Sequence, residues 1–147
     1  MGHKYANLFA QQGAWPDTMG HPREYFQRHG CVLDCRGPLV IDATALVGLC
    51  VMIVTQSHDI SNWPELGPIV KRPVTIDAHA WIGSRSLLCG CHIGEGAIVA
   101  AGTVLRSQNV APYTMVAGDP ARVIARWQGG AWVYVDGAAE AFPRELV

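Results

Sequence analysis

Residues 76–110 read IDAHAW-IGSRSL-LCGCH-IGEGAI-VAAGTV-LRSQNV, and every block begins with Ile or Leu or Val. All the blocks have six residues except the third, which has five. The same rhythm runs upstream through residues 35–58 as CRGPLV-IDATAL-VGLCVM-IVTQSH, and it resumes at Val70 after residues 59–69. A period of six fits neither the 3.6-residue helix nor the two-residue strand.

This repeat predicts an all-β fold, a parallel β-helix with three short rungs to each coil. The aliphatic first residue of each block is expected to stack inside, and the fifth residue is small because it also points inward near a corner. Glycine at the second position is expected to adopt unusual backbone angles. The eleven blocks predict three to four coils. An ordinary parallel sheet would need crossover helices, and residues 35–110 show no helical period.

The remaining segments predict one domain over residues 1–147. Residues 1–34 form a weakly patterned lead-in with a short helix around 22–27, and residues 35–110 form the β-helix with a loop at 59–69. Residues 111–147 form a closing segment and tail, because Pro112 and Pro120 cannot donate to a strand ladder. The aromatic stretch 127–137 predicts a turn and one short strand that covers the open end of the β-helix.

Composition excludes several classes of protein. Apolar residues make up 50% of the 147 and charged residues 16%, which indicates a folded core. The net charge of −1 gives no basic footprint for a nucleic acid. The longest apolar run, Ala45–Val54, is too short to cross a bilayer, so no membrane partner is expected. Five cysteines without a signal-peptide pattern indicate reduced thiols and a cytoplasmic protein.

The sequence resembles the hexapeptide-repeat acyltransferases, and among them the sugar O-acetyltransferases of the galactoside, maltose, capsule and colanic-acid types. The resemblance runs from Ile41 to about Trp127. It rests on the blocks Ile76-Asp-Ala-His-Ala-Trp-Ile-Gly83 and Ile93-Gly-Glu-Gly-Ala-Ile-Val-Ala-Ala-Gly-Thr-Val-Leu105, and on the closing segment Pro112-Tyr-Thr-Met-Val-Ala-Gly-Asp-Pro-Ala-Arg-Val-Ile124. It implies a left-handed β-helix and homotrimers with a site between two barrels.

The resemblance also implies a catalytic role for His58. In these enzymes the histidine just before the inserted loop is the general base, and Thr55-Gln-Ser-His-Asp59 matches that position. A neutral imidazole can take the proton of a hydroxyl that attacks the thioester of acetyl-CoA, with no metal required. Asp59 and Asp34 are weaker candidates for orienting His58 or contacting a small-molecule acceptor, and Trp63 for stacking on a sugar.

For the coenzyme, the resemblance places the pantetheine arm against Ser84 and Ala101. It places Arg106 and Ser107 near the nucleotide end, and Arg122 near the phosphates, which suit a guanidinium. Ser107 stands where the family commonly has Lys. The five-residue block 88–92 lacks the family's Pro-Gly turn.

Two other functions remain open at this stage. A metalloenzyme of the γ-carbonic-anhydrase type shares the fold and would need three converging histidines. The spacings of His58, His79 and His92 are 21 and 13 residues, and neither is a multiple of six. A catalytically idle β-helix that binds or supports a partner is the other alternative. An acceptor amine in place of a hydroxyl also remains possible.

Overall fold

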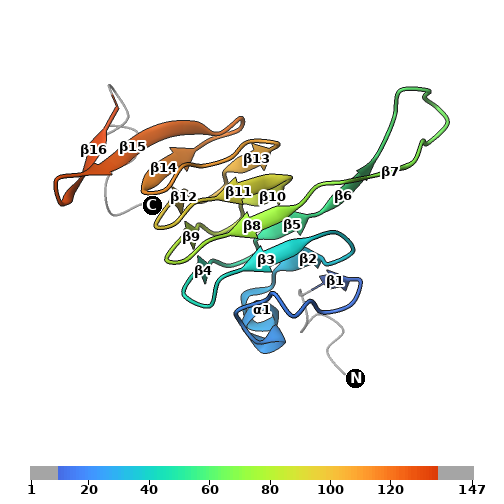
Figure 1. The fold of residues 1–147 in the computed structure, drawn as a ribbon, viewed down its shortest axis with the longest axis horizontal. Coiled ribbons are helices and arrows are strands. Elements are labelled where there is room, and N and C mark those ends of the chain that lie inside the picture. Colours follow the sequence, from blue (N-terminus) through green and yellow to red (C-terminus); the bar gives the residue numbers. More distant parts are fainter. Residues whose placement is uncertain (1–9, 136–147) are drawn as a thin grey trace, which may run out of the picture.

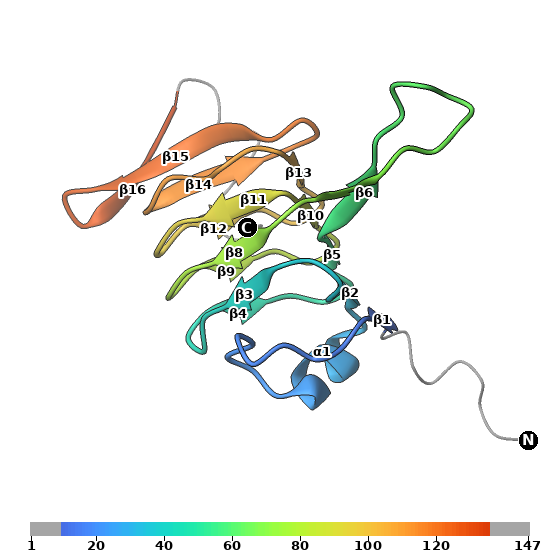
Figure 2. The same ribbon diagram turned by 45° about the vertical axis from the view of Figure 1, so that its right-hand side comes forward.

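A computed structural model describes residues 10–135, in which the chain winds into a parallel β-helix with three flat faces (Figures 1 and 2). The predicted fold is confirmed. We call the faces sheets A, B and C. Sheet A contains, in spatial order, β1 (Ala10–Gln12), β2 (Val32–Asp34), β5 (Met52–Val54), β10 (Leu87–Cys89) and β13 (Val104–Arg106).

Sheets B and C complete each coil. Sheet B contains β3 (Leu39–Ile41), β8 (Val74–Ile76) and β11 (Cys91–Ile93). The parallel part of sheet C contains β4 (Leu46–Val47), β9 (Trp81–Ile82), β12 (Ile98–Val99) and β14 (Thr114–Ala117). Three coils are complete, and in a fourth the place of a sheet B strand is taken by Val110, which bridges to Ile93. This agrees with the predicted three to four coils.

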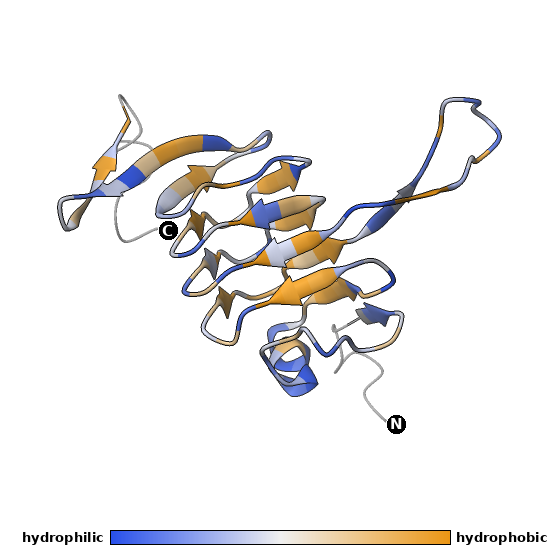
Figure 3. Ribbon diagram, viewed as in Figure 1, coloured by the Kyte–Doolittle hydropathy of each residue, from blue (hydrophilic) through white to orange (hydrophobic). Residues whose placement is uncertain are grey.

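The core consists of aliphatic columns, one behind each sheet. In-register pairing stacks the inward residues of successive coils directly above one another. The columns are Leu33-Ile53-Leu88-Leu105 in sheet A, Ile41-Ile76-Ile93 in sheet B and Val47-Ile82-Val99-Val116 in sheet C, all at most 5% exposed. Burying each such side chain contributes about 1.5–3 kcal/mol. Figure 3 shows the apolar coil strands beside a hairpin of mixed character, β6–β7, in which β6 is polar.

The corner residues explain the rest of the repeat. The small fifth residues Ala45, Ala80, Ser86, Ala97 and Thr103 are at most 1% exposed, as predicted. The expectation for glycine at the second position was wrong. Left-handed angles occur instead two residues later, at Cys50, His79, Arg85, Gly96 and Gly102. Second-position glycine is needed for close approach, since a Cβ on Gly83 would lie 2.4 Å from the Ala101 nitrogen of the next coil.

The lead-in segment covers the first coil. The helix predicted around residues 22–27 is α1 (Arg23–His29), which ends at Gly30 in the left-handed conformation. Its Phe26 is fully buried. The Tyr25 hydroxyl donates to the Val47 carbonyl at 3.0 Å and accepts from the Val47 N–H at 2.9 Å. A side chain of α1 therefore satisfies the backbone of β4, which has no strand on that side.

The closing segment contains more strand than the sequence predicted. Instead of one short strand, β15 (Arg122–Gln128) and β16 (Ala131–Tyr134) form an antiparallel hairpin that extends sheet C beyond β14. It covers the free edge of β14. Residues 1–9 of the lead-in and 136–147 of the tail lie outside the described residues. Among residues 10–135, no helix has the length and apolar character that crossing a membrane requires.

We predict that the core columns dominate stability. The change Leu88→Ala removes a fully buried side chain and should lower the free energy of unfolding by about 2–5 kcal/mol. The same change at Leu66, which is 60% exposed, should alter it by less than about 0.5 kcal/mol. Denaturant unfolding measures both, and equal losses would contradict this account of the core.

Candidate functional site

One antiparallel hairpin leaves the β-helix between β5 and β8. It contains β6 (Gln56–His58) and β7 (Ile69–Lys71), and it projects from the edge where sheets A and B meet, called here the A–B edge (Figure 2). The excursion is longer than the loop predicted at 59–69. Ser57 and Val70, which the repeat placed on coil rungs, pair with each other in the hairpin instead. The coil resumes at Val74.

His58 lies at the end of β6 with its side chain exposed. Its Nδ1 is 3.0 Å from the carbonyl oxygen of Gly67, across the neck of the hairpin. A carbonyl oxygen only accepts, so Nδ1 must carry the proton and donate. The neutral ring then has its lone pair on Nε2. The backbone therefore selects the tautomer in which Nε2 can accept a proton.

Asp59 serves the turn rather than the imidazole. Its Oδ1 accepts from the Ser61 N–H at 2.9 Å and from the Ser61 hydroxyl at 2.6 Å. These bonds, the hydroxyl bond first, lower the pKa of the Asp59 carboxyl. The Asp59 backbone also bonds Gly67 and Pro68, which closes the hairpin neck. The group that orients His58 is thus the Gly67 carbonyl, which no sequence pattern indicated.

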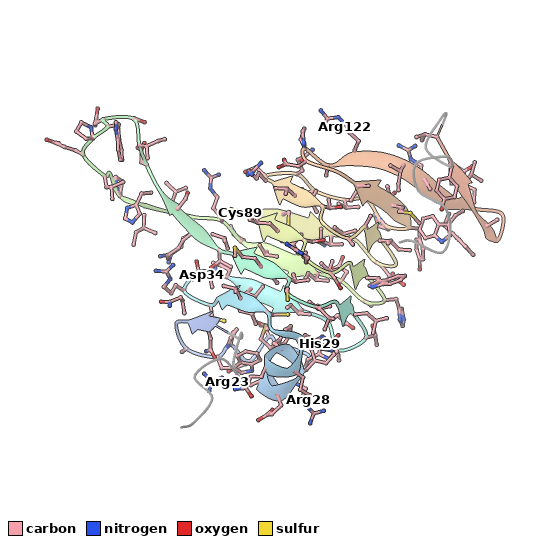
Figure 4. The ribbon with its side chains drawn as sticks, turned by 180° about the vertical axis from the view of Figure 1, so that it is seen from behind. Arg23, Arg28, His29, Asp34, Cys89 and Arg122 are labelled. Atoms are coloured by element: carbon pink, nitrogen blue, oxygen red, sulfur yellow. The ribbon has the colours of Figure 1, made fainter. Side chains whose placement is uncertain are left out.

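Asp34 is a buried carboxylate at the end of β2, and it is fully engaged within its own corner (Figure 4). Its Oδ1 accepts from the Arg36 Nε at 2.7 Å, and its Oδ2 from the Thr55 N–H at 3.3 Å. Burial raises its pKa, but the bonds from Arg36 and Thr55 outweigh burial and leave the pKa below its usual value. Asp34 fixes the corner from which the hairpin departs.

Trp63 is exposed near the tip of the hairpin. It belongs to an exposed apolar set on the hairpin, comprising Ile60, Trp63, Leu66 and Ile69, each more than half exposed. Large apolar side chains grouped on a projecting segment are typical of a contact surface.

Ser84 and Ala101 lie one above the other at a different edge, between sheets C and A, called here the C–A edge. The Gly102 N–H donates to the Ser84 carbonyl at 2.9 Å, which places successive coils in register there. The Ser84 Oγ accepts from the Leu49 N–H of the coil below at 3.0 Å. This edge thus has regularly stacked backbone and the small residues Ser84 and Ala101, beside the exposed side chains of Leu49 and Arg85.

The basic candidates lie on the last coil. Arg106 ends β13, and its Nη1 is 3.2 Å from the Asp119 Oδ1 in an exposed ion pair. Ser107 follows at the A–B edge with a left-handed backbone, and its N–H donates to the Cys89 carbonyl at 2.9 Å. Arg122 begins β15 and is exposed (Figure 4). The predicted coenzyme residues therefore lie in three places. Ser84 and Ala101 are at the C–A edge, Arg106 and Ser107 are at the end of β13 near the A–B edge, and Arg122 is in the β15–β16 hairpin.

A cleft of about 320 Å³, called here the A–B cleft, opens beside the base of the hairpin. Its lining includes Lys71, Arg72, Gly90, Ser107 and Asn109. The five-residue block turns its corner with Gly90 alone between β10 and β11. The basic pair Lys71-Arg72 was not recognised as part of a site, although it lies in the first block after the repeat resumes at Val70.

A second cleft of about 300 Å³ lies where sheets B and C meet, and it differs in charge. We call it the B–C cleft. Its lining includes Asp42, Asp77 and Glu95. The Asp77 Oδ2 is 2.7 Å from the His92 Nε2, and Glu95 accepts from the Tyr113 hydroxyl at 2.9 Å.

Within the described residues, three of the histidines do not converge and two of the cysteines are buried. His58 lies on the hairpin, His79 in the turn after β8 and His92 in the middle of β11, so they do not share an edge. Within residues 10–135, no group of three or more His, Cys, Asp or Glu could hold a metal ion. Burial raises the pKa of Cys91 to about 12 and of Cys31 to about 11, which keeps both thiols protonated and unreactive.

Known proteins share this fold and this repeat. A "putative acetyltransferase" of Saccharomyces cerevisiae is 30% identical over 104 residues, which are 69% of this chain and 53% of the relative. A maltose O-acetyltransferase structure from Clostridium difficile superposes with a TM-score of 0.61 at 25% identity, over 68% of this chain and 54% of that one. The resemblance to the hexapeptide-repeat acetyltransferases is confirmed.

A further structure, a hexapeptide-repeat acetyltransferase from Vibrio cholerae complexed with acetyl coenzyme A, has a TM-score of 0.53 at 20% identity. It covers 84% of this chain and 73% of its own, and it shows the shared fold. The coils are those of a left-handed β-helix. The chain spans about half the length of the curated relatives it matches, and no protein-family model matches it.

We predict a structural role for Asp34 that depends on pH. Its pKa is depressed in the fold, so its ion pair stabilises above the unfolded pKa and is lost as pH falls below it. Asp34→Asn should lower the free energy of unfolding by about 1–3 kcal/mol at pH 7. The difference from wild type should shrink below about pH 4. Urea unfolding at several pH values measures this, with exposed Asp17→Asn as control; a constant difference would contradict it.

Proposed function

We propose that this protein is an acyltransferase that moves an acetyl group from acetyl-CoA to a hydroxyl of a small carbohydrate-like acceptor. The observation that carries the proposal is the His58 imidazole, held through Nδ1 by the Gly67 carbonyl with Nε2 left free. It stands on the β6–β7 hairpin, which leaves the coils between β5 and β8. Both the histidine and the hairpin match the position of base and loop in the sugar O-acetyltransferases.

The chemistry is a direct transfer in a ternary complex. Nε2 of His58 accepts the hydroxyl proton while the acceptor oxygen attacks the thioester carbon, and a backbone N–H stabilises the oxyanion. The C–S bond then breaks, and the thiolate takes the proton from the imidazolium to leave as free CoA. His58 returns to its neutral form, so one acetyl group is exchanged for one proton with no net oxidation.

The donor is assigned to the C–A edge and the last coil. Stacked backbone beside the small residues Ser84 and Ala101 suits the amides of a pantetheine arm, which lies along the barrel axis. Arg106, Ser107 and Arg122 are assigned to the nucleotide and its phosphates. The acetyl coenzyme A complex of the Vibrio cholerae protein and the shared repeat support a CoA thioester as donor.

The assembly is assigned as a homotrimer with each site between two subunits. In one subunit, His58 projects from the A–B edge while Ser84 and Ala101 lie at the C–A edge, on the opposite side of sheet A. A neighbouring copy can place its C–A edge beside the hairpin and complete the site. The outward residues Leu46 and Trp81 of sheet C, in register and exposed, provide an apolar surface for this contact.

We predict that His58→Gln lowers kcat about 10²- to 10⁴-fold with little change in acetyl-CoA affinity. Glutamine retains a hydrogen-bonding side chain but cannot accept the proton. His79→Gln, an exposed histidine at the B–C corner, is the matched control and should behave as wild type. Loss of thioester absorbance across a panel of sugars, other alcohols and amines measures the rate, without interference from the protein's own thiols.

Two results would count against this assignment. Equal rates of wild type and His58→Gln on a true substrate would remove His58 from catalysis. Failure of the wild type to bind acetyl-CoA in calorimetry would favour the idle β-helix. Activity on amines alone would keep the base and change the acceptor class.

We also predict that Leu46→Arg dissociates the trimer, since it places a charge in the apolar contact. Val40→Arg changes an exposed aliphatic residue of the same coil on sheet B and should leave the trimer intact. Sedimentation equilibrium measures the mass, which should be three times that of one chain for wild type. A monomeric wild type, or equal effects of the two variants, would contradict the proposed contact.

A further inference from the structure

Within the described residues, the A–B cleft carries the positive charges of Lys71 and Arg72, neither of which is paired with a carboxylate. Among residues 10–135, only Arg36, His92 and Arg106 form ion pairs with carboxylates. Lys71 donates through Nζ to the Arg36 carbonyl at 2.9 Å and to the Gln56 Oε1 at 3.1 Å, and both acceptors are uncharged. Arg72 donates through Nε to the Ser57 hydroxyl at 3.3 Å, which is also uncharged. None of the residues that line this cleft is acidic.

The Arg72 side chain is held over the cleft by the short corner. A Cβ on Gly90 would lie 3.3 Å from the Arg72 Cδ, so the aliphatic stem rests against the bare glycine backbone. The bond to Ser57 fixes Nε, which leaves the N–H groups of the two terminal nitrogens for a ligand. The Asn109 Oδ1 accepts from the His92 N–H at 2.9 Å, so its amide nitrogen is also available. Lys71, Arg72 and Asn109 thus give the cleft cations and hydrogen-bond donors together.

This cleft is linked directly to the proposed base. Arg72 bonds the Ser57 side chain, which joins the cleft to β6 but lies on the opposite face of the hairpin from His58. Lys71 lies opposite Gln56 and Ile69 opposite His58, and alternate residues of a strand share a face. Lys71 and His58 are therefore diagonal neighbours on the same face of the hairpin, a separation within reach of long side chains.

The A–B and B–C clefts carry opposite charges, and this difference determines which of them an anion enters. Sheet B has cations at one edge and the carboxylates of Asp42, Asp77 and Glu95 at the other. An anion is attracted to the A–B cleft and repelled from the B–C cleft, so charge alone distinguishes two hollows of similar volume.

We propose that the A–B cleft binds a carboxylate or phosphate group of the acceptor, which makes the acceptor an anionic sugar or hydroxy acid. Arg72 is the main contact and Lys71 the second, and Lys71, which shares a face of the hairpin with His58, directs the acceptor hydroxyl toward Nε2. This inference rests on the proposed function. The phosphates of CoA have the same chemistry and are the other source of an anion for this cleft. The experiment below distinguishes binding of the acceptor from binding of CoA.

The experiment is calorimetric titration of the full chain with inorganic phosphate while CoA is saturating. Wild type should bind phosphate, more weakly as NaCl is added. Arg72→Gln should weaken binding about tenfold or more, Lys71→Gln should weaken it less, and both should leave CoA affinity unchanged. Arg28→Gln makes the same charge change on α1, far from the cleft, and should match wild type (Figure 4).

Several outcomes would overturn the proposal. They are absence of phosphate binding, equal binding by Arg72→Gln and Arg28→Gln, or displacement of phosphate by CoA together with weaker CoA binding in Arg72→Gln. The last would assign the cleft to the coenzyme. Failure of CoA to bind at all would count against the proposed function, and the comparison of phosphate binding between the variants would still decide the cleft.

Discussion

The structure depends on the in-register stacking of one coil upon the next. Because each inward aliphatic residue rests on its counterpart in the neighbouring coil, the three columns of the core and the three edges of the barrel form together. The edges inherit this regularity. A small residue such as Ala101 lies above Ser84 for the same reason that Val99 lies above Ile82, so a defect in the core would displace the edge as well.

Because the coils are so regular, a segment that departs from them, such as the β6–β7 hairpin, stands out as a candidate functional feature. The hairpin after β5 is stabilised by its own ladder and by a buried corner in which Asp34 bonds Arg36 and Thr55. That corner anchors the hairpin, and the Gly67 carbonyl then sets the tautomer of His58. The core thus supports the corner, the corner anchors the hairpin, and a backbone carbonyl of the hairpin orients the imidazole.

The sequence predicted the coils because the six-residue period is imposed by the core, and the core acts on every rung alike. The same period identified His58 as a candidate site residue, because the repeat breaks directly after it. The sequence could not predict the Gly67 contact, because a backbone carbonyl leaves no trace in residue type. Ser57 and Val70 were misplaced because apolar and small residues in a hairpin satisfy the same pattern as rungs. The sequence predicted one short strand where β15 and β16 form a hairpin. β15 pairs with the free edge of β14, and no sequence repeat indicates that antiparallel pairing.

The charge distribution follows from the same geometry. Outward residues at an edge make no contribution to the core columns, so they can differ in charge without cost to the fold. Sheet B therefore has Lys71 and Arg72 at one edge and Asp77 and Glu95 at the other. The one-residue corner at Gly90 leaves room for the stem of Arg72, which a Cβ at this position would crowd. The irregular block that weakens the family pattern is thus the feature that seats a cation beside the hairpin of His58.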